Sequence, residues 1–219
     1  MQLIKNLYTF LWSDYTANNC NTYLIRDGKN ILIDPGHFHL FGHVQDALSR
    51  LSMSLKDIDV VIITHGHPDH MEAIRVFDLK NSLIAVHAKE MDFIRNVAPH
   101  YGNALGLPGF EPQILLREGE LNIGALTFHV IHTPGHSPGS ICLYWPENKA
   151  LFTGDVVFSQ GVGRTDLAGG NGGELKESIR KISRLDTVFL LPGHGEVVAG
   201  ADAVRENFKE IEEFWFAYI

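Results

Sequence analysis

The chain is poor in cysteine and in positive charge, and it has no long hydrophobic run. Its two cysteines, Cys20 and Cys142, form no close-spaced motif, so we expect two reduced thiols that face the core. The formal net charge of −8 argues against a nucleic-acid partner. No segment approaches the roughly 20 apolar residues that span a bilayer, and the N-terminus lacks a basic-then-apolar secretory pattern. We therefore expect a cytoplasmic protein without a membrane partner.

The 219 residues, 45% of them hydrophobic, can bury a substantial core. Short apolar runs predict strands near residues 3–12, 21–26, 30–34, 59–64, 83–87, 112–117, 126–132, 139–145, 150–154 and 187–191. Helices are expected near 42–52, 69–77, 88–95, 172–185 and 201–219, and the glycines and prolines of 97–113 predict a loop. These elements suggest two sheets packed face to face and covered by helices. We expect one α/β domain over residues 1–219, without a separate C-terminal substrate domain.

The most informative motif is residues 64–70, Thr-His-Gly-His-Pro-Asp-His, which directly follow the apolar strand at 60–63. Side chains two apart on an extended segment point the same way, so His65 and His67 can converge on one ion. The proline suits the first position of a helix, which puts Asp69 and His70 in its first turn. Because the two pairs leave the backbone in different directions, they suit two adjacent metal ions better than one.

Three further loops each place a ligand-type residue after an apolar strand. His136 follows the strand at 126–131, in a loop marked by proline and glycine. Asp155 follows the strand at 150–153, and His194 follows the strand at 188–191. The same arrangement recurs too regularly for chance, so these three residues are further candidate metal ligands.

Together, these motifs and their order resemble the metallo-β-lactamase superfamily, from about residue 21 to His194. The resemblance implies a four-layer αββα sandwich, in which two mixed β-sheets are flanked by helices. It also implies two metal sites with Asp155 bridging them. The first site would consist of His65, His67 and His136, and the second of Asp69, His70 and His194.

Charge counting agrees with a hydrolytic centre. Two divalent cations carry about four positive charges, and Asp69, Asp155 and a bridging hydroxide carry about three negative ones. The remaining charge, about one unit, matches the tetrahedral intermediate that forms when the metal-bridging hydroxide attacks a carbonyl carbon. Zinc is the favoured metal, with iron or manganese as alternatives. In enzymes that this chain resembles, the counterpart of Asp69 orients the hydroxide or shuttles its proton, which makes Asp69 the candidate catalytic residue.

Departures within the superfamily narrow the expected substrate. Asp155 stands where the best-known lactam-hydrolysing members typically have cysteine, so we do not expect antibiotic hydrolysis. The stretch at 161–167 resembles both the short glyoxalase II-like proteins and the persulfide dioxygenases. We therefore predict a glyoxalase II-like hydroxyacylglutathione hydrolase that acts on a small thioester or ester. The alternatives are a lactone hydrolase and a mononuclear iron persulfide dioxygenase, whose iron would be bound by His65, His136 and Asp155.

Three residues outside the ligand set are candidates for contacts with ligands or substrate. Arg164 could brace a metal-binding carboxylate or bind a substrate carboxylate, or it could form a local pair with Asp166 that only fixes a glycine-rich loop. His37 follows the strand at 31–33 and could touch the substrate or line the rim of its cleft.

The last predicted helix carries an apolar stripe that should dock on the domain. Its aromatic cluster at 214–216 exceeds what one narrow face can bury. The aromatic side chains that the domain cannot bury could instead form a homodimer contact. The other expected partner is a small-molecule substrate.

Overall fold

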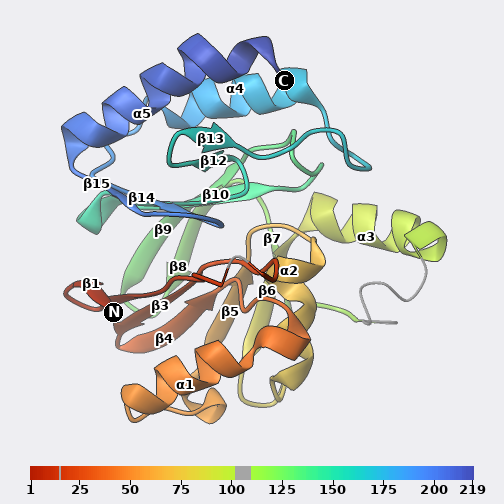
Figure 1. Ribbon diagram of the computed structural model, residues 1–219. Helices are drawn as coiled ribbons and strands as arrows, with labels where there is room; N and C mark the ends of the chain where they lie inside the picture. Colours follow the sequence, from red (N-terminus) through yellow and green to blue (C-terminus); the bar gives the residue numbers. More distant parts are fainter. Residues whose placement is uncertain (15, 102–109) are drawn as a thin grey trace.

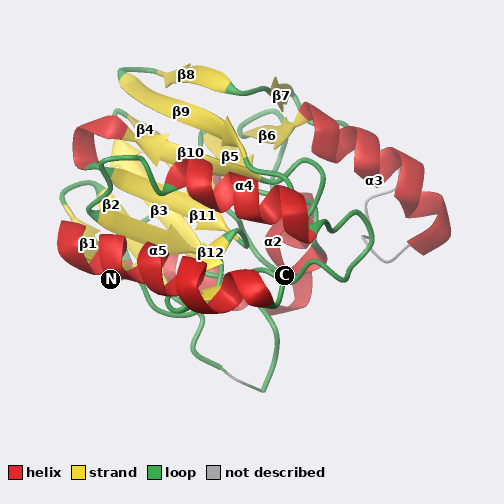
Figure 2. Ribbon diagram, turned by 90° about the horizontal axis from the view of Figure 1, so that it is seen from above, coloured by secondary structure: helices red, strands yellow, loops and turns green. Residues whose placement is uncertain are grey.

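The computed structural model describes residues 1–14, 16–101 and 110–219, with the backbone alone for 97–101. Two β-sheets pack face to face, and helices cover their outer faces (Figures 1 and 2). The expected αββα sandwich with two mixed sheets is confirmed. Within the described residues, no helix is both long enough and apolar enough to cross a membrane.

The first sheet has seven strands in chain order. They are β1 (Gln2–Ile4), β2 (Leu7–Phe10), β3 (Thr22–Asp27), β4 (Lys29–Ile33), β5 (Val60–Ile63), β6 (Leu83–His87) and β7 (Ile114–Leu116). Pairing is antiparallel from β1 to β4 and parallel from β4 to β7. The parallel pairs place the C-terminal ends of β4, β5 and β6 at the same edge of the sheet.

The second sheet has six strands in the order β15-β14-β11-β10-β9-β8. They are β8 (Gly119–Ile123), β9 (Leu126–His132), β10 (Ile141–Trp145), β11 (Ala150–Gly154), β14 (Phe189–Pro192) and β15 (Val198–Ala199). Among the neighbouring pairs of these described strands, β11–β14 is parallel and the others are antiparallel. A separate two-stranded ribbon, β12 (Val157–Phe158) and β13 (Gly161–Val162), follows β11.

The described residues also form five α-helices and several short 3-10 helices. The α-helices are α1 (Gly42–Arg50), α2 (Pro68–Met71), α3 (Ala88–Tyr101), α4 (Gly172–Ile182) and α5 (Ala201–Phe214). The 3-10 helices are η1 (Phe38–Leu40), η2 (Leu55–Asp57), η3 (Glu72–Val76), η5 (Pro146–Asn148) and η6 (Trp215–Ala217). Helix α1 packs on the first sheet, and α4 and α5 pack on the second.

The core follows from the alternation of side chains along the strands. On β4, Ile31 and Ile33 face the space between the sheets, whereas Leu32 faces α1. Both faces of this strand are apolar because both are covered. Phe128 and Trp145 of the second sheet fill the same inter-sheet core. This packing fixes the two sheets relative to each other, and with them the loops at their edges.

Several predicted boundaries were wrong. The strand expected at 3–12 is divided into β1 and β2 by a turn at Asn6, whose φ is 67°. The helix expected at 69–77 becomes the 3-10 helix η3 after Met71. Strand β8 was missed because its residues are mostly polar and exposed.

The predicted start of the loop at residue 97 was wrong, because α3 continues to Tyr101. Pro99 lacks a backbone donor, but it does not end the helix. Residues 110–113 are irregular, and the rest of the predicted loop, 102–109, lies outside the described residues.

Candidate metal centre

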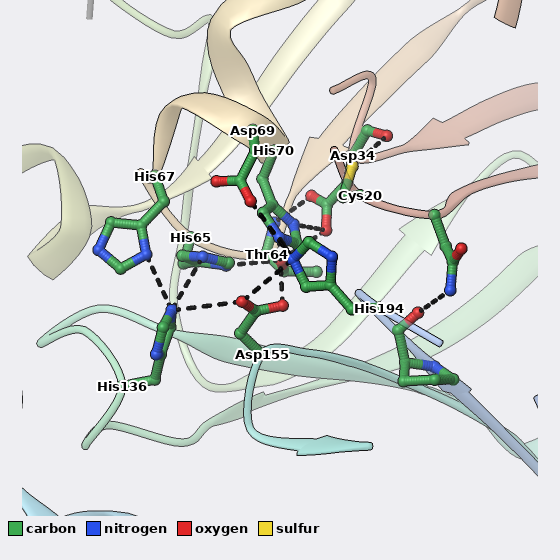
Figure 3. A network of polar contacts seen from close by, with 12 residues as sticks. Cys20, Asp34, Thr64, His65, His67, Asp69, His70, His136, Asp155 and His194 are labelled. Atoms are coloured by element: carbon green, nitrogen blue, oxygen red, sulfur yellow. Dashed lines mark hydrogen bonds and ion pairs between the residues drawn. The ribbon is translucent and has the colours of Figure 1, made fainter. Parts of the chain in front are cut away.

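The first group of candidate ligands lies where β5 ends and α2 begins. All residues of β5 are buried, and the chain leaves its C-terminal end through the loop that carries His65 and His67. Pro68 is the first residue of α2, as predicted, and it places Asp69 and His70 in the first turn. Figure 3 shows these four side chains directed towards the second sheet.

The second sheet supplies the other three candidates from loops at the facing edge. His136 lies between β9 and β10, Asp155 directly follows β11, and His194 follows β14. The amide of Ile141 donates to the carbonyl of Thr64 at 3.0 Å, which ties the two sheets together beside the site. The structure therefore brings together all seven residues that were predicted from separate motifs.

Three histidine nitrogens converge in one half of the site. His136 Nε2 lies 2.8 Å from His67 Nδ1 and 3.2 Å from His65 Nε2. A tetrahedral site with metal–nitrogen bonds of about 2.0–2.1 Å holds its ligand atoms about 3.3 Å apart. The observed spacing fits a metal ion bound by the three imidazoles. Hydrogen bonds alone would not explain it, because a single proton on His136 Nε2 cannot be donated fully to both His65 and His67.

The other half of the site contains two histidines and two carboxylates. His194 Nε2 lies 3.3 Å from His70 Nε2 and 3.3 Å from Asp69 Oδ2. Asp155 lies between the two halves. Its Oδ1 is 3.1 Å from His70 Nε2, and its Oδ2 is 3.4 Å from His194 Nε2 and 3.6 Å from His136 Nε2. This position fits the predicted bridging role.

The two halves differ in their electrostatics. Burial and the neighbouring His136 lower the pKa of His67 to about 4, so its ring is neutral and has a free lone pair at neutral pH. Burial also lowers the pKa of His194, but its contacts with Asp155 and Asp69 outweigh burial and raise this pKa to about 9. Burial raises the pKa of Asp69, but the contact with His194 and the charge of His70 bring it below its ordinary value. The second half therefore balances carboxylate charges with protons that a metal ion would replace.

Outer groups hold the imidazole rings in the orientation that ligation needs. Asp34 accepts hydrogen bonds from the Thr64 amide at 2.8 Å, from Thr64 Oγ1 at 2.6 Å and from His70 Nδ1 at 2.8 Å. His136 Nδ1 donates to the backbone carbonyl of Arg164 at 2.8 Å. A proton fixed on Nδ1 leaves Nε2 of each ring free to bind a metal ion.

Arg164 and Asp166 form the expected local pair, and Arg164 also lines the cavity over the candidate ligands, so its contact with substrate stays a prediction. The Arg164 guanidinium donates to both carboxylate oxygens of Asp166 at 2.7 Å, and both side chains are largely exposed. Arg164 supports His136 through its backbone carbonyl oxygen, which accepts the hydrogen bond from His136 Nδ1. His37 pairs with Glu72 at 2.9 Å and is not among the residues that line the cavity over the site.

A cavity of about 520 Å³ opens over the candidate ligands, large enough for a small molecule. Beyond the ligands, its walls include Asn18, Phe158, Val162 and Leu167. Asn18 Nδ2 donates to Asp69 Oδ2 at 2.7 Å, a contact that sequence reasoning missed. Asn18 is far from Asp69 in the chain and belongs to no ligand-like pattern, so no local signal could have identified it.

Comparisons with known proteins agree with this geometry. A probable metallo-hydrolase of Methanocaldococcus jannaschii is 37% identical over 187 residues, covering 81% of this chain and 88% of the relative. Hydroxyacylglutathione hydrolase GloC of Haemophilus influenzae is 33% identical over 202 residues, covering 88% of this chain and 93% of the relative.

A solved structure adds a likeness in three dimensions. The crystal structure of a B3 metallo-β-lactamase superposes with a TM-score of 0.70 at 31% identity, covering 85% of this chain and 90% of that one. Residues 15–194 match the family model of the metallo-β-lactamase superfamily, and this stretch contains every candidate ligand. With these relatives and this architecture, the chain belongs to the metallo-β-lactamase superfamily.

Proposed function

We propose that the chain is a dinuclear metal-dependent hydrolase of a small thioester or ester, of the glyoxalase II-like hydroxyacylglutathione hydrolase type. The observation that carries this proposal is the convergence of five histidines and two aspartates from two sheets beneath a cavity open to small molecules. The relative named hydroxyacylglutathione hydrolase supports a thioester as the substrate.

The residues divide into two ligand sets. His65, His67 and His136 would hold one ion. Asp69, His70 and His194 would hold the other, and Asp155 would contact both. When bound, two divalent ions lower the pKa of water towards neutrality and polarise the substrate carbonyl. We propose zinc as these ions, with iron and manganese as alternatives.

Asp69 is the proposed catalytic residue, because it combines charge with a fixed orientation. Its lowered pKa keeps the carboxylate ionised at neutral pH. Asn18 and His194 both contact Oδ2, which leaves Oδ1 available to orient the attacking water and accept its proton. Phe158, Val162 and Leu167 would contact the acyl group from the apolar wall of the cavity.

The test combines metal analysis with a substrate panel. Protein purified without added metal is assayed for zinc, iron and manganese, and then with a hydroxyacylglutathione, a simple ester, a lactone and a lactam. We expect about two ions per chain, thioester hydrolysis, and its loss in Asp69→Asn. The lactam is included because of the similar B3 metallo-β-lactamase structure.

Other outcomes would contradict the assignment. Lactam turnover without thioester turnover would make the expectation from Asp155 wrong. One iron per chain with oxygen uptake on glutathione persulfide would favour the dioxygenase alternative.

We also propose a homodimer contact through the end of α5. Phe214 and Tyr218 are 64% and 83% exposed, whereas Phe216 packs against the Arg180 side chain. The excess aromatic surface therefore lies mainly at Phe214 and Tyr218, and Trp215, at 40% exposed, adds to it. Sedimentation should give a dimer that Phe214→Ser with Tyr218→Ser dissociates, and a wild-type monomer would refute the contact. The single-domain organisation and the cytoplasmic location stay predictions.

A further inference from the structure

Glu90 is a buried acidic residue that lies beside the candidate metal centre and belongs to neither ligand set. It is in the first turn of α3, and the residue is only 1% exposed. Three donors converge on its carboxylate. The Gly66 amide donates to Oε1 at 2.7 Å, while the Gly139 amide at 2.7 Å and Ser137 Oγ at 2.8 Å donate to Oε2. Both oxygens of this buried carboxylate therefore accept hydrogen bonds, and these bonds fix the position of the side chain.

These donors belong to the two loops that build the three-histidine half of the site. Gly66 lies between His65 and His67, and Ser137 directly follows His136. The first loop comes from the edge of the first sheet and the second loop from the edge of the second sheet. Glu90 therefore joins the two sheets at the point where their histidine ligands must meet.

The packing around Glu90 leaves little room for movement. A Cβ atom added at Gly139 would lie 2.1 Å from the Glu90 backbone nitrogen, and one added at Gly66 would lie 2.9 Å from Glu90 Oε1. Both glycines are thus in direct contact with the residue that accepts their hydrogen bonds. A change in the position of this carboxylate would be transmitted to both loops.

We propose that Glu90 is a positioning residue that sets the separation of His65 and His67 from His136, and thereby the affinity of the three-histidine site for its metal ion. The proposal rests on the dinuclear centre proposed above. It is specific to one of the two ions, because the other ligand set is held by different groups. Asp34 orients His70, and Asn21 donates to the carbonyls on either side of His194, at Pro192 and Gly195.

Glu90→Gln is a close test of this role because it keeps the shape of the side chain. The carboxylate accepts on both oxygens, whereas a glutamine has one acceptor and one donor group. If the amide oxygen faces Gly139 and Ser137, the NH₂ group faces the Gly66 amide. If the amide turns over, the NH₂ group faces the Gly139 amide. In either orientation one ligand loop loses its anchor and meets a donor instead.

The experiment measures stepwise binding of Zn²⁺ to the metal-free full chain by competition with a chromophoric chelator. His67→Ala and His194→Ala identify which step belongs to which ligand set. We expect Glu90→Gln to weaken the step that His67→Ala abolishes by about 10- to 100-fold, the range typical for groups that orient metal ligands. The step that His194→Ala abolishes should keep its affinity, which also reports that the variant is folded.

Ser137→Ala is the matched mild variant, since it removes one of the three donors and leaves both backbone anchors. It should weaken the same step by less than Glu90→Gln does. Unchanged affinities in Glu90→Gln, or equal weakening of both steps, would overturn the positioning role. A wild-type chain that binds no Zn²⁺ would overturn it together with the dinuclear centre. A chain that binds two ions but hydrolyses no thioester would refute only the proposed function.

Discussion

Asp34→Asn should weaken the binding of the proposed metal ion by His70 while the chain keeps its fold. Asp34 adopts a left-handed backbone conformation with φ of 51°, which asparagine tolerates well among the non-glycine residues. The two side chains also have the same shape. The substitution therefore keeps the shape of residue 34, but it replaces one acceptor oxygen with an NH₂ donor and removes the carboxylate charge.

The expected effect follows from the three contacts of Asp34. The amide oxygen can keep the hydrogen bond from the Thr64 amide, so the NH₂ group replaces Oδ2 and faces Thr64 Oγ1 and His70 Nδ1. To accept from this NH₂ group, His70 must carry its proton on Nε2. That nitrogen is the one that faces His194 Nε2 at 3.3 Å and Asp155 Oδ1 at 3.1 Å, so it could no longer bind a metal ion.

We expect one of the two Zn²⁺ affinities to fall by about 10- to 100-fold, which corresponds to about 1.4–2.7 kcal/mol. The free energy of unfolding of the metal-free protein should also fall, by about 3 kcal/mol, because the substitution breaks the buried ion pair between Asp34 and His70. The chelator competition assay and denaturant unfolding without metal measure the two quantities separately.

Asp59→Asn is the matched control. Asp59 accepts from the backbone amide of Asn30 at 2.8 Å and from Lys29 Nζ at 2.7 Å, where β4 begins, at the opposite end of that strand from Asp34. It should leave both metal affinities unchanged. Equal metal affinities in Asp34→Asn and wild type would refute the view that Asp34 fixes the tautomer of His70.

Two further predictions concern the loop beside Asp155 and the response to acid. In Gly163→Ala the new Cβ would lie 1.8 Å from the Asp155 carbonyl oxygen, so metal content and activity should fall, whereas Gly161→Ala, with its nearest atom at 3.6 Å, should retain both. Burial and the neighbouring His132 lower the pKa of His87 to about 4, whereas its pKa in the unfolded chain is about 6.5. Between these two pH values the unfolded chain binds a proton at His87 and the folded chain does not. His87 should therefore contribute about 2 kcal/mol to the fall in the free energy of unfolding between about pH 7 and pH 5. This contribution should be absent in His87→Leu, as urea titration can measure, and a variant with the wild-type slope would contradict it.

The candidate ligands could be predicted because each is marked locally. His136, Asp155 and His194 follow apolar strands in loops with glycine or proline, and the strand pairing that brings these loops together follows from the fold. The groups that orient them could not be predicted in the same way. Glu90 is 24 positions from Gly66 and 47 from Ser137, and Asn18 is 51 positions from Asp69. Such contacts depend on tertiary packing rather than on any periodic pattern.

Secondary structure shows the same division between local and distant causes. Strand β5 is apolar along its whole length because both of its faces are covered, and it was predicted nearly to the residue. Strand β8 has mostly exposed positions, and it is held by pairing with β9 along its whole length. Its polar sequence carries no hydrophobic period, so only the partner strand explains it.

Each proposed ion would draw its ligands from both sheets, and this has a consequence for the order of events in folding. Neither edge alone offers a complete set of donors, so a cation has no complete site until the sandwich has closed. Small zinc-dependent modules gain their folding energy from the metal itself, whereas here the cation would arrive last. Zn²⁺ should therefore slow the opening of the sandwich while leaving its rate of closure nearly unchanged.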